Sequence, residues 1–282
     1  MALSALSAVV IAYPADIAKE NVVITDENVE YLLSAKNGKL SSIKKRRQST
    51  LTAVYSDDNI MFTAFYGNGI SIDKASAPGC KPVYRSWEPG DIFYSGSRIC
   101  ALPIKLSKGK PTKVTIEQTY SDPWRFSTVF LPSPYLSSHS VTTIKVPPEL
   151  KKTITITPMG LTDKMEFKCS ENSDGSVTYT VEARDTPPFR DEEHAPLDGI
   201  DAPQLILSGY YDGVSQLYAH LKSFIEEESE NETVEIDSIA NRLDNGNGNI
   251  YATIDSIASW VRDNIRYVGI EHGDYGIKPV SY

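Results

Sequence analysis

The chain of 282 residues contains only three cysteines and four histidines, so few side chains could serve as thiol nucleophiles, imidazole bases or zinc ligands. Cys80, Cys100 and Cys169 form no Cys-x-x-Cys pair and have no histidine at ligand spacing, which excludes a typical structural zinc site. Three thiols allow at most one intrachain disulfide, and the sequence leaves the choice of pair open. The chain is long enough to bury a core without such a crosslink.

Positive charge is also scarce. The chain has 28 lysines and arginines against 37 aspartates and glutamates, a net charge of -9. This charge repels phosphate backbones, so we expect no nucleic-acid partner. The one basic run, Lys44 to Arg47, is shorter than a typical basic patch, and we interpret it as a solvated strand or loop.

No apolar run is long enough to span a bilayer, so we expect no transmembrane span. The apolar stretch from Ala2 to Tyr13 resembles the central region of a secretory signal, although no lysine or arginine precedes it. We therefore expect residues 1–19 to be a signal peptide or its remnant and the protein to be exported. A late gene start and a first strand are the alternatives.

Residues 20–209 read as a succession of short strands rich in Thr, Val, Ile, Tyr and Phe, separated by Gly, Pro, Asn and Asp. Apolar side chains alternate with polar ones in several runs, which predicts strands with one buried face. The clearest runs contain Ile60, Phe62 and Ala64, and Val114, Ile116, Gln118 and Tyr120.

The best-defined hairpin spans 165–181 and turns at Asp174-Gly175, where glycine accepts a positive φ. It sets Met165, Phe167 and Cys169 against Val177, Tyr179 and Val181, so we expect Cys169 to be a small core residue. Prolines at 132, 134, 147 and 148 predict edge strands or crossings between sheets. Together these features favour an antiparallel β-sandwich-like domain.

Residues 210–282 change to helical periodicity, so the fold class is α+β. An amphipathic helix is expected after Asp212, and a second short helix before the turn from Asp244 to Asn249. A third carries a stripe at Ile254, Ile257, Ala258, Val261 and Ile265, and extended character resumes at 267–270.

Several motifs carry no chemistry. Asp191 to His194 lies between prolines and is expected to be a solvated loop, because adjacent side chains rarely converge on one ligand. Gly67-x-Gly69 and the Asp244 to Asn249 stretch are turns, since they lack dinucleotide and EF-hand spacing. His139 is expected in a loop and His220 one step off the apolar stripe of its helix, so both are expected at the surface or at the boundary of the core. We therefore expect no catalytic residue, cofactor or metal site.

The segment from Ile257 to Gly273, followed by Tyr275-Gly-Ile-Lys-Pro279, resembles the opening of a bacterial transglutaminase-like core. Its helix ends in Trp-Val-Arg-Asp-Asn-Ile and continues into Arg-Tyr-Val. The upstream residues, especially 87–91 and 141–148, resemble the β-rich domain of unknown function that precedes such cores in exported bacterial proteins. The matching positions Trp260, Asn264, Tyr267, Gly273 and Pro279 have packing and turning roles.

The resemblance implies a Cys-His-Asp triad for acyl transfer or amide hydrolysis, and a periplasmic or cell-surface location. In the family those three residues follow the Gly/Pro loop, and none of this chain's cysteines lies in such a motif. We therefore expect a truncated, non-catalytic β-rich accessory module that binds a protein, peptide or glycan. The alternative is the front fragment of an active cysteine hydrolase or acyltransferase acting on protein or peptide amides.

The third helix has a consequence for stability. Its apolar stripe would face the missing core, so we expect it to stay exposed and then to pack on the β domain, fray or mediate a dimer. Whether the chain is a natural truncation or a fragment stays open at this stage.

Overall fold

The computed structural model describes residues 20–67, 69–86, 93–94, 98–121, 123, 126–189, 202–209, 214–216, 218–219, 222–223, 234–244, 248–265 and 269–270. The chain divides into two compact units. The first contains residues 1–85 and 98–210, and the second contains residues 86–97 and 211–282. The expected signal peptide at 1–19 lies outside the described residues.

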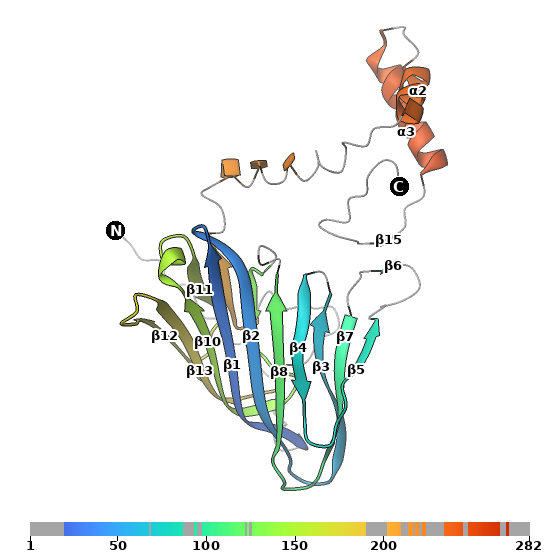
Figure 1. Cartoon of the computed structure of the whole chain (residues 1–282). Helices are drawn as coiled ribbons and strands as arrows, with labels where there is room; N and C mark the ends of the chain where they lie inside the picture. The colour runs from blue at the N-terminus through green and yellow to red at the C-terminus, as the bar shows by residue number, and fades with distance from the viewer. Residues whose placement is uncertain are drawn as a thin grey trace. The chain divides into compact units, whose positions relative to one another are not determined.

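The first unit is dominated by a seven-stranded sheet with the strand order β12-β13-β10-β1-β2-β8-β4 (Figure 1). The strands are β1 (Val22–Lys36), β2 (Lys39–Ala53), β4 (Ile70–Ser76), β8 (Thr112–Tyr120), β10 (Leu136–Val146), β12 (Met165–Glu171) and β13 (Val177–Thr186). All neighbouring pairs are antiparallel except β1 and β10, which are parallel. The predicted antiparallel arrangement therefore holds except at this pair, where β10 enters the large sheet from another sheet rather than through a hairpin.

Two three-stranded sheets complete the sandwich. One has the order β3-β7-β5 and the other β11-β14-β9. Their strands are β3 (Asp58–Tyr66), β5 (Val83–Ser86), β7 (Arg98–Leu106), β9 (Thr128–Phe130), β11 (Thr155–Met159) and β14 (Gln204–Ser208). The expected mostly β, α+β architecture is confirmed at this level.

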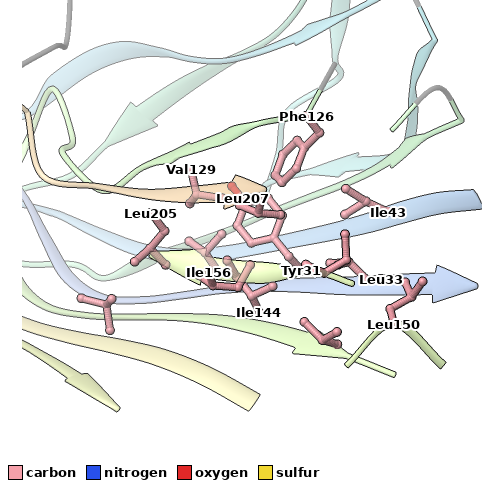
Figure 2. Packing of buried hydrophobic residues seen from close by; sticks show 14 residues of the cluster. Tyr31, Leu33, Ile43, Phe126, Val129, Ile144, Leu150, Ile156, Leu205 and Leu207 are labelled. Carbon is pink, nitrogen blue, oxygen red and sulfur yellow. The ribbon is translucent and has the colours of Figure 1, made fainter. Parts of the chain in front are cut away.

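Each small sheet shares an apolar cluster with the large one. The first cluster joins Tyr31 and Ile144 of the large sheet to Leu205 and Ile156 of the β11-β14-β9 sheet, with Phe126 beside them (Figure 2). The second joins Leu51 and Ile116 to side chains of β3 and β7, including Phe62, Leu102 and Ile104. Burying a large aliphatic side chain contributes about 1.5–3 kcal/mol, so these clusters hold the layers together.

Both clusters lie on one face of the large sheet, which we call the inner face. On β2 the buried residues Ile43, Leu51 and Ala53 are all odd-numbered, as alternation requires. On β1 they change from even (Ile24) to odd (Val29), because a β-bulge between Ile24 and Asp26 inserts one residue. The bulge keeps β1 facing inward along its whole length.

The four prolines singled out in the sequence lie in connections between strands. Pro132 and Pro134 fall between β9 and β10, and Pro147 and Pro148 lie between β10 and β11, with a 3₁₀ turn, η3, at Pro148–Leu150. Each pair separates strands of different sheets, so the predicted crossings are confirmed. The hairpin at Gly175, whose φ is 79°, is confirmed, and Phe167 and Cys169 face Val181 and Tyr179 as two of the predicted partners. Met165 instead faces Ala183, and Val177 faces Glu171, so the register differs in part from the prediction.

The second unit contains helices α2 (Val234–Leu243) and α3 (Ile250–Asn264), which contact each other. Asn249 caps α3 by accepting hydrogen bonds from the backbone N–H groups of Tyr251 and Ala252. Residues 214–216, 218–219 and 222–223 are helical, in the region of the first expected helix. Short strands β6 (Phe93–Tyr94) and β15 (Gly269–Ile270) pair in parallel within this unit.

The predicted exposure of the α3 stripe is confirmed. No residue of α3 is buried. Its large apolar side chains are 42–67% exposed at Ile250, Ile254, Ile257 and Val261. Among the described residues, no helix has the length and apolar character needed to cross a membrane.

Candidate functional site

The basic run of β2 divides between the two faces of the large sheet. Lys44 and Arg46 point outward, as the solvated interpretation requires, but Lys45 and Arg47 lie on the inner face. That interpretation was therefore wrong for half of the run. Because side chains alternate along a strand, every second one points into the sandwich. The sequence did not indicate which face of the strand a second sheet would cover.

Arg47 is held in the sandwich by a buried carboxylate. Its Nε–H donates to Glu27 Oε1 at 2.8 Å, and the Ser49 hydroxyl donates to the same oxygen at 2.6 Å. The guanidinium also lies over the Phe62 ring, 4.6 Å from its centroid. Nearby, Gln118 donates to the carbonyl of Phe65 at 2.7 Å. These paired groups form an inner polar cluster between the two apolar clusters.

Lys45 lies next to this cluster, with its ammonium 5.4 Å from the centroid of the Tyr31 ring. Burial lowers the pKa of Lys45 below its ordinary value. Tyr120 and Glu27 oppose the shift, whereas Arg47 reinforces it. Burial raises the pKa of Tyr31 and of Tyr120. The inner polar cluster thus has the features of a structural network rather than of an accessible site.

The outer face of the large sheet carries a shallow polar depression of about 120 Å³. It is lined by Asn28 and Glu30 of β1, Arg46 and Gln48 of β2, and Thr143 of β10. Asn28 is opposite Gln48, and Glu30 is opposite both Arg46 and Thr143 in the strand registers. Two amides, a carboxylate, a guanidinium and a hydroxyl therefore converge, a set that binds polar ligands by hydrogen bonds.

Charge alternates along the row of outer-face residues that passes through this depression. Across the seven strands the row reads Lys168, Thr180, Thr143, Glu30, Arg46, Glu117 and Lys74. Arg46 Nε lies 3.4 Å from Glu117 Oε1, so its charge is partly compensated inside the row. The depression is consequently close to neutral and is suited to an uncharged or mixed-charge ligand.

His139 borders the same face and lies in β10, so the predicted loop was wrong. Its Nδ1 is 2.9 Å from Asp26 Oδ1 and its Nε2 is 3.4 Å from Glu182 Oε1. Arg184 contacts Glu182 as well and, with a smaller effect of His139, holds the pKa of that carboxyl below its usual range. Since both ring nitrogens face carboxylates, His139 links β1 to β13 across β10.

The three cysteines are free thiols. Cys80 donates to the carbonyl of Pro103 at 3.0 Å. Cys100 is buried beside Tyr84, and burial raises its pKa. Cys169 is exposed and interacts with Tyr179, so its predicted core position was wrong. The alternation of Met165 and Phe167 is real, but the opposing layer does not extend over position 169.

Some predicted features fall outside the described residues. They are Asp191 to His194, His220, and the motif positions Tyr267, Gly273 and Pro279. Trp260 and Asn264 lie on α3, and Asn264 donates to the carbonyl of Trp260. Among the residues that the structure describes, no three His, Cys, Asp or Glu side chains are grouped to hold a metal ion.

Sequence reasoning missed the outer-face depression because its residues are far apart in the chain and ordinary for exposed strand positions. Thr143 is about a hundred residues from Arg46 and Gln48, and only the parallel β1–β10 pairing places them together. The one available signal was the density of polar residues along 26–30 and 44–48.

The comparison with known proteins finds a similar fold but no matching family. No known protein family and no curated protein matches the sequence. Among solved structures, a "putative protease" from Parabacteroides distasonis superposes over 86% of this chain with a TM-score of 0.53 and 16% identity. The chain spans about half of that protein, 50% of its length. At this identity the likeness establishes a shared fold only.

Two weaker similarities involve proteins of other kinds. An M1 zinc metallopeptidase from Deinococcus radiodurans matches 67% of this chain and 42% of its own, with a TM-score of 0.37 and 12% identity. A "putative nutrient binding protein" from Legionella pneumophila matches 68% of each chain, with a TM-score of 0.39 and 7% identity. Neither similarity enters the reasoning below.

Proposed function

We propose that this chain is a non-catalytic, β-rich binding module of a transglutaminase-like protein, joined to the first helices of that protein's core. The observation that carries the binding role is the outer-face depression, where five hydrogen-bonding side chains from three strands converge. The proposed ligand is a protein, peptide or glycan segment with neutral or balanced charge.

The environment of the thiols supports a non-catalytic role. A thiol nucleophile needs a base and a setting that lowers its pKa. Here the described partners of the three cysteines are carbonyl groups and tyrosine hydroxyls, and the pKa of Cys100 is raised. His139, the histidine that the structure describes, is engaged by Asp26 and Glu182.

The link to a transglutaminase-like core rests on the resemblance of 257–279 and on the state of α3. In such a core the stripe from Ile254 to Ile265 packs against the nucleophile helix and the sheet. In this chain the stripe is exposed, which leaves an apolar surface available for such packing.

The binding role is tested by screening purified protein against glycan and peptide arrays. The R46A/Q48A variant is expected to lose at least tenfold in affinity for a captured ligand, since it removes two sets of donors from the depression. K145A, elsewhere on the outer face, serves as the matched control. Equal binding by all three proteins would show that the depression is not the site.

The second candidate is the front fragment of an active cysteine hydrolase or acyltransferase acting on protein or peptide amides, favoured by the same motif at 257–279. The purified chain is expected neither to hydrolyse amides nor to crosslink them. Activity that disappears on replacing Cys80, Cys100 or Cys169 with serine would overturn the non-catalytic proposal. A reading frame after the Tyr282 codon that encodes a Gly-Asp-Cys element and a later histidine would favour the second candidate.

Export to the periplasm or cell surface of a bacterium is part of the proposal. It rests on the apolar stretch from Ala2 to Tyr13. Intact-mass measurement on protein from native cells is expected to show cleavage near residue 19. Recovery of the complete N-terminus from a cytosolic fraction would contradict export.

A further inference from the structure

We propose that β12, the edge strand of the large sheet, pairs antiparallel with β12 of a second copy of this chain. Phe167 lies on the two-fold axis, and the two large sheets become continuous. β12 is the terminal strand in the sheet order, and no further strand pairs with it in the described part of the chain (Figure 1). This interaction is independent of the proposed ligand site.

The backbone of β12 is arranged for such pairing. Arg184 N–H donates to the carbonyl of Lys164, which identifies the even-numbered residues as those bonded to β13. The N–H and C=O groups of Phe167 and Cys169 therefore point away from β13, toward the edge. The β12–β13 ladder has no bulge between Met165 and Glu171, and the strand contains no proline. A bulge or a proline usually blocks pairing at an edge strand, and β12 has neither.

Two other edges in the first unit are interrupted. β4, at the opposite end of the large sheet, has a register shift between Ile72 and Lys74. β11, at the edge of its small sheet, contains Pro158. Within the large sheet, β12 is thus the regular edge and β4 the interrupted one.

Charge complementarity selects a second copy and a single register. Glu166 and Lys168 lie on the outer face and are 63% and 60% exposed, joined within the strand by an ion pair of 2.8 Å. With the two-fold axis at Phe167, Glu166 of each copy is opposite Lys168 of the other, giving two cross-strand ion pairs. An axis at Glu166 or at Lys168 would place two like charges opposite each other.

The inner face is compatible with the same register. Phe167, which stacks on Tyr179 with ring centroids 6.2 Å apart, would meet its counterpart at the axis. Cys169, exposed in the single chain, would be opposite Met165 of the second copy. The arrangement is isologous, so it closes as a dimer and does not propagate as a filament.

A lone lysine on an edge strand normally prevents pairing between sheets. Here a carboxylate two positions away changes its effect, because in the register described each lysine meets a glutamate. The charges of β12 consequently disfavour pairing with most other strands and favour pairing with β12 of a second copy.

Sedimentation velocity over a protein concentration range of about 1 to 100 µM provides the test. The wild-type chain is expected to show a monomer–dimer equilibrium in that range. E166K and K168E each place like charges opposite each other twice and are expected to weaken dimerisation by about tenfold or more. The E166K/K168E double variant restores complementarity and is expected to return the dimer affinity to within about twofold of wild type.

Two further variants test whether association depends on the backbone of β12 or on surface charge in general. C169P removes an N–H that points away from β13 and is expected to abolish the dimer, whereas C169A is expected to preserve it. K44E, on the interior strand β2 of the same face, is the charge-reversal control and should not affect association. Circular dichroism and urea unfolding establish that each variant is folded.

A wild-type chain that stays monomeric over the whole range would overturn the proposal. So would equal dimerisation of the two single charge variants and wild type, or failure of the double variant to recover. A dimer that survives these changes but is lost in I257E would assign association to the α3 stripe instead.

Discussion

Arg47 and Glu27 form an ion pair of 2.8 Å inside the sandwich, between its two apolar clusters. Their side chains are 23% and 9% exposed, respectively. The guanidinium of the pair lies against the Phe62 ring of β3, so the ion pair is covered from the small sheet by an aromatic side chain. The same basic run supplies Arg46 to the outer-face depression, so β2 contributes charged side chains to both faces of the large sheet.

Removal of Arg47 should be strongly destabilising. R47M leaves the Glu27 carboxylate buried without its cation, which costs roughly 3 kcal/mol of the free energy of unfolding. R46M, one position away on the outer face, should change this free energy by less than about 0.5 kcal/mol. Urea unfolding measures both. The E27Q/R47M double variant should recover part of the loss, and equal effects of R47M and R46M would contradict a buried pair.

Lys45 should make stability depend on pH above neutrality. Its folded pKa lies below the ordinary value of 10.5, so the unfolded chain binds more protons between the two values. The free energy of unfolding therefore rises with pH in that window. K45M should be more stable than wild type at pH 7, by about 1 kcal/mol, and should lack this rise.

The measurement for Lys45 is urea unfolding between pH 7 and 9.5, with K44M as the exposed neighbour for comparison. Above about pH 10 the raised pKa of Tyr31 acts in the opposite direction, because the folded state then retains a proton that the unfolded state releases. A K45M variant less stable than wild type at pH 7 would show that the ammonium is favourably paired.

Low pH should destabilise the β12–β13 turn. Hydrogen bonds from the Ser176 hydroxyl and backbone, with a further contribution from Lys145, lower the pKa of Asp174 to about 2. Its contribution to stability is present above its ordinary pKa of 3.8 and is lost as the pH falls from there toward 2. D174N should therefore show a smaller loss of stability than wild type over this interval, measured by thermal unfolding at a series of pH values.

Thiol reactivity should follow exposure. Cys169 is expected to be alkylated first in the folded protein, and buried Cys100 only after unfolding, when its raised pKa returns to the ordinary range. Peptide mapping by mass spectrometry after timed alkylation distinguishes the sites. Simultaneous modification of both cysteines under native conditions would contradict the described packing.

Hydrogen exchange should separate the two units. Amides of α3 are expected to exchange much faster than those of β1, because no α3 residue is buried whereas β1 is bonded on both sides. Exchange followed by mass spectrometry on the whole chain provides the comparison. Protection of α3 equal to that of β1 in a monomer would indicate a covering surface that the exposed stripe does not reveal.

The sequence alone determined the elements whose causes are local. Alternation at 60–64 and 114–120, the Asp174-Gly175 turn, the proline crossings and the apolar stripe of α3 each depend on neighbours a few residues apart. The predicted transglutaminase-like link depends on a short motif and stays a prediction.

Only the tertiary structure decided which face of each strand is covered and over what length. The bulge before Asp26, the parallel β1–β10 pair and the limited extent of the small sheets place Arg47 inside, Cys169 outside and Thr143 beside Glu30. Alternation assigns side chains to two faces, but burial is set by a second layer whose strands come from distant parts of the chain.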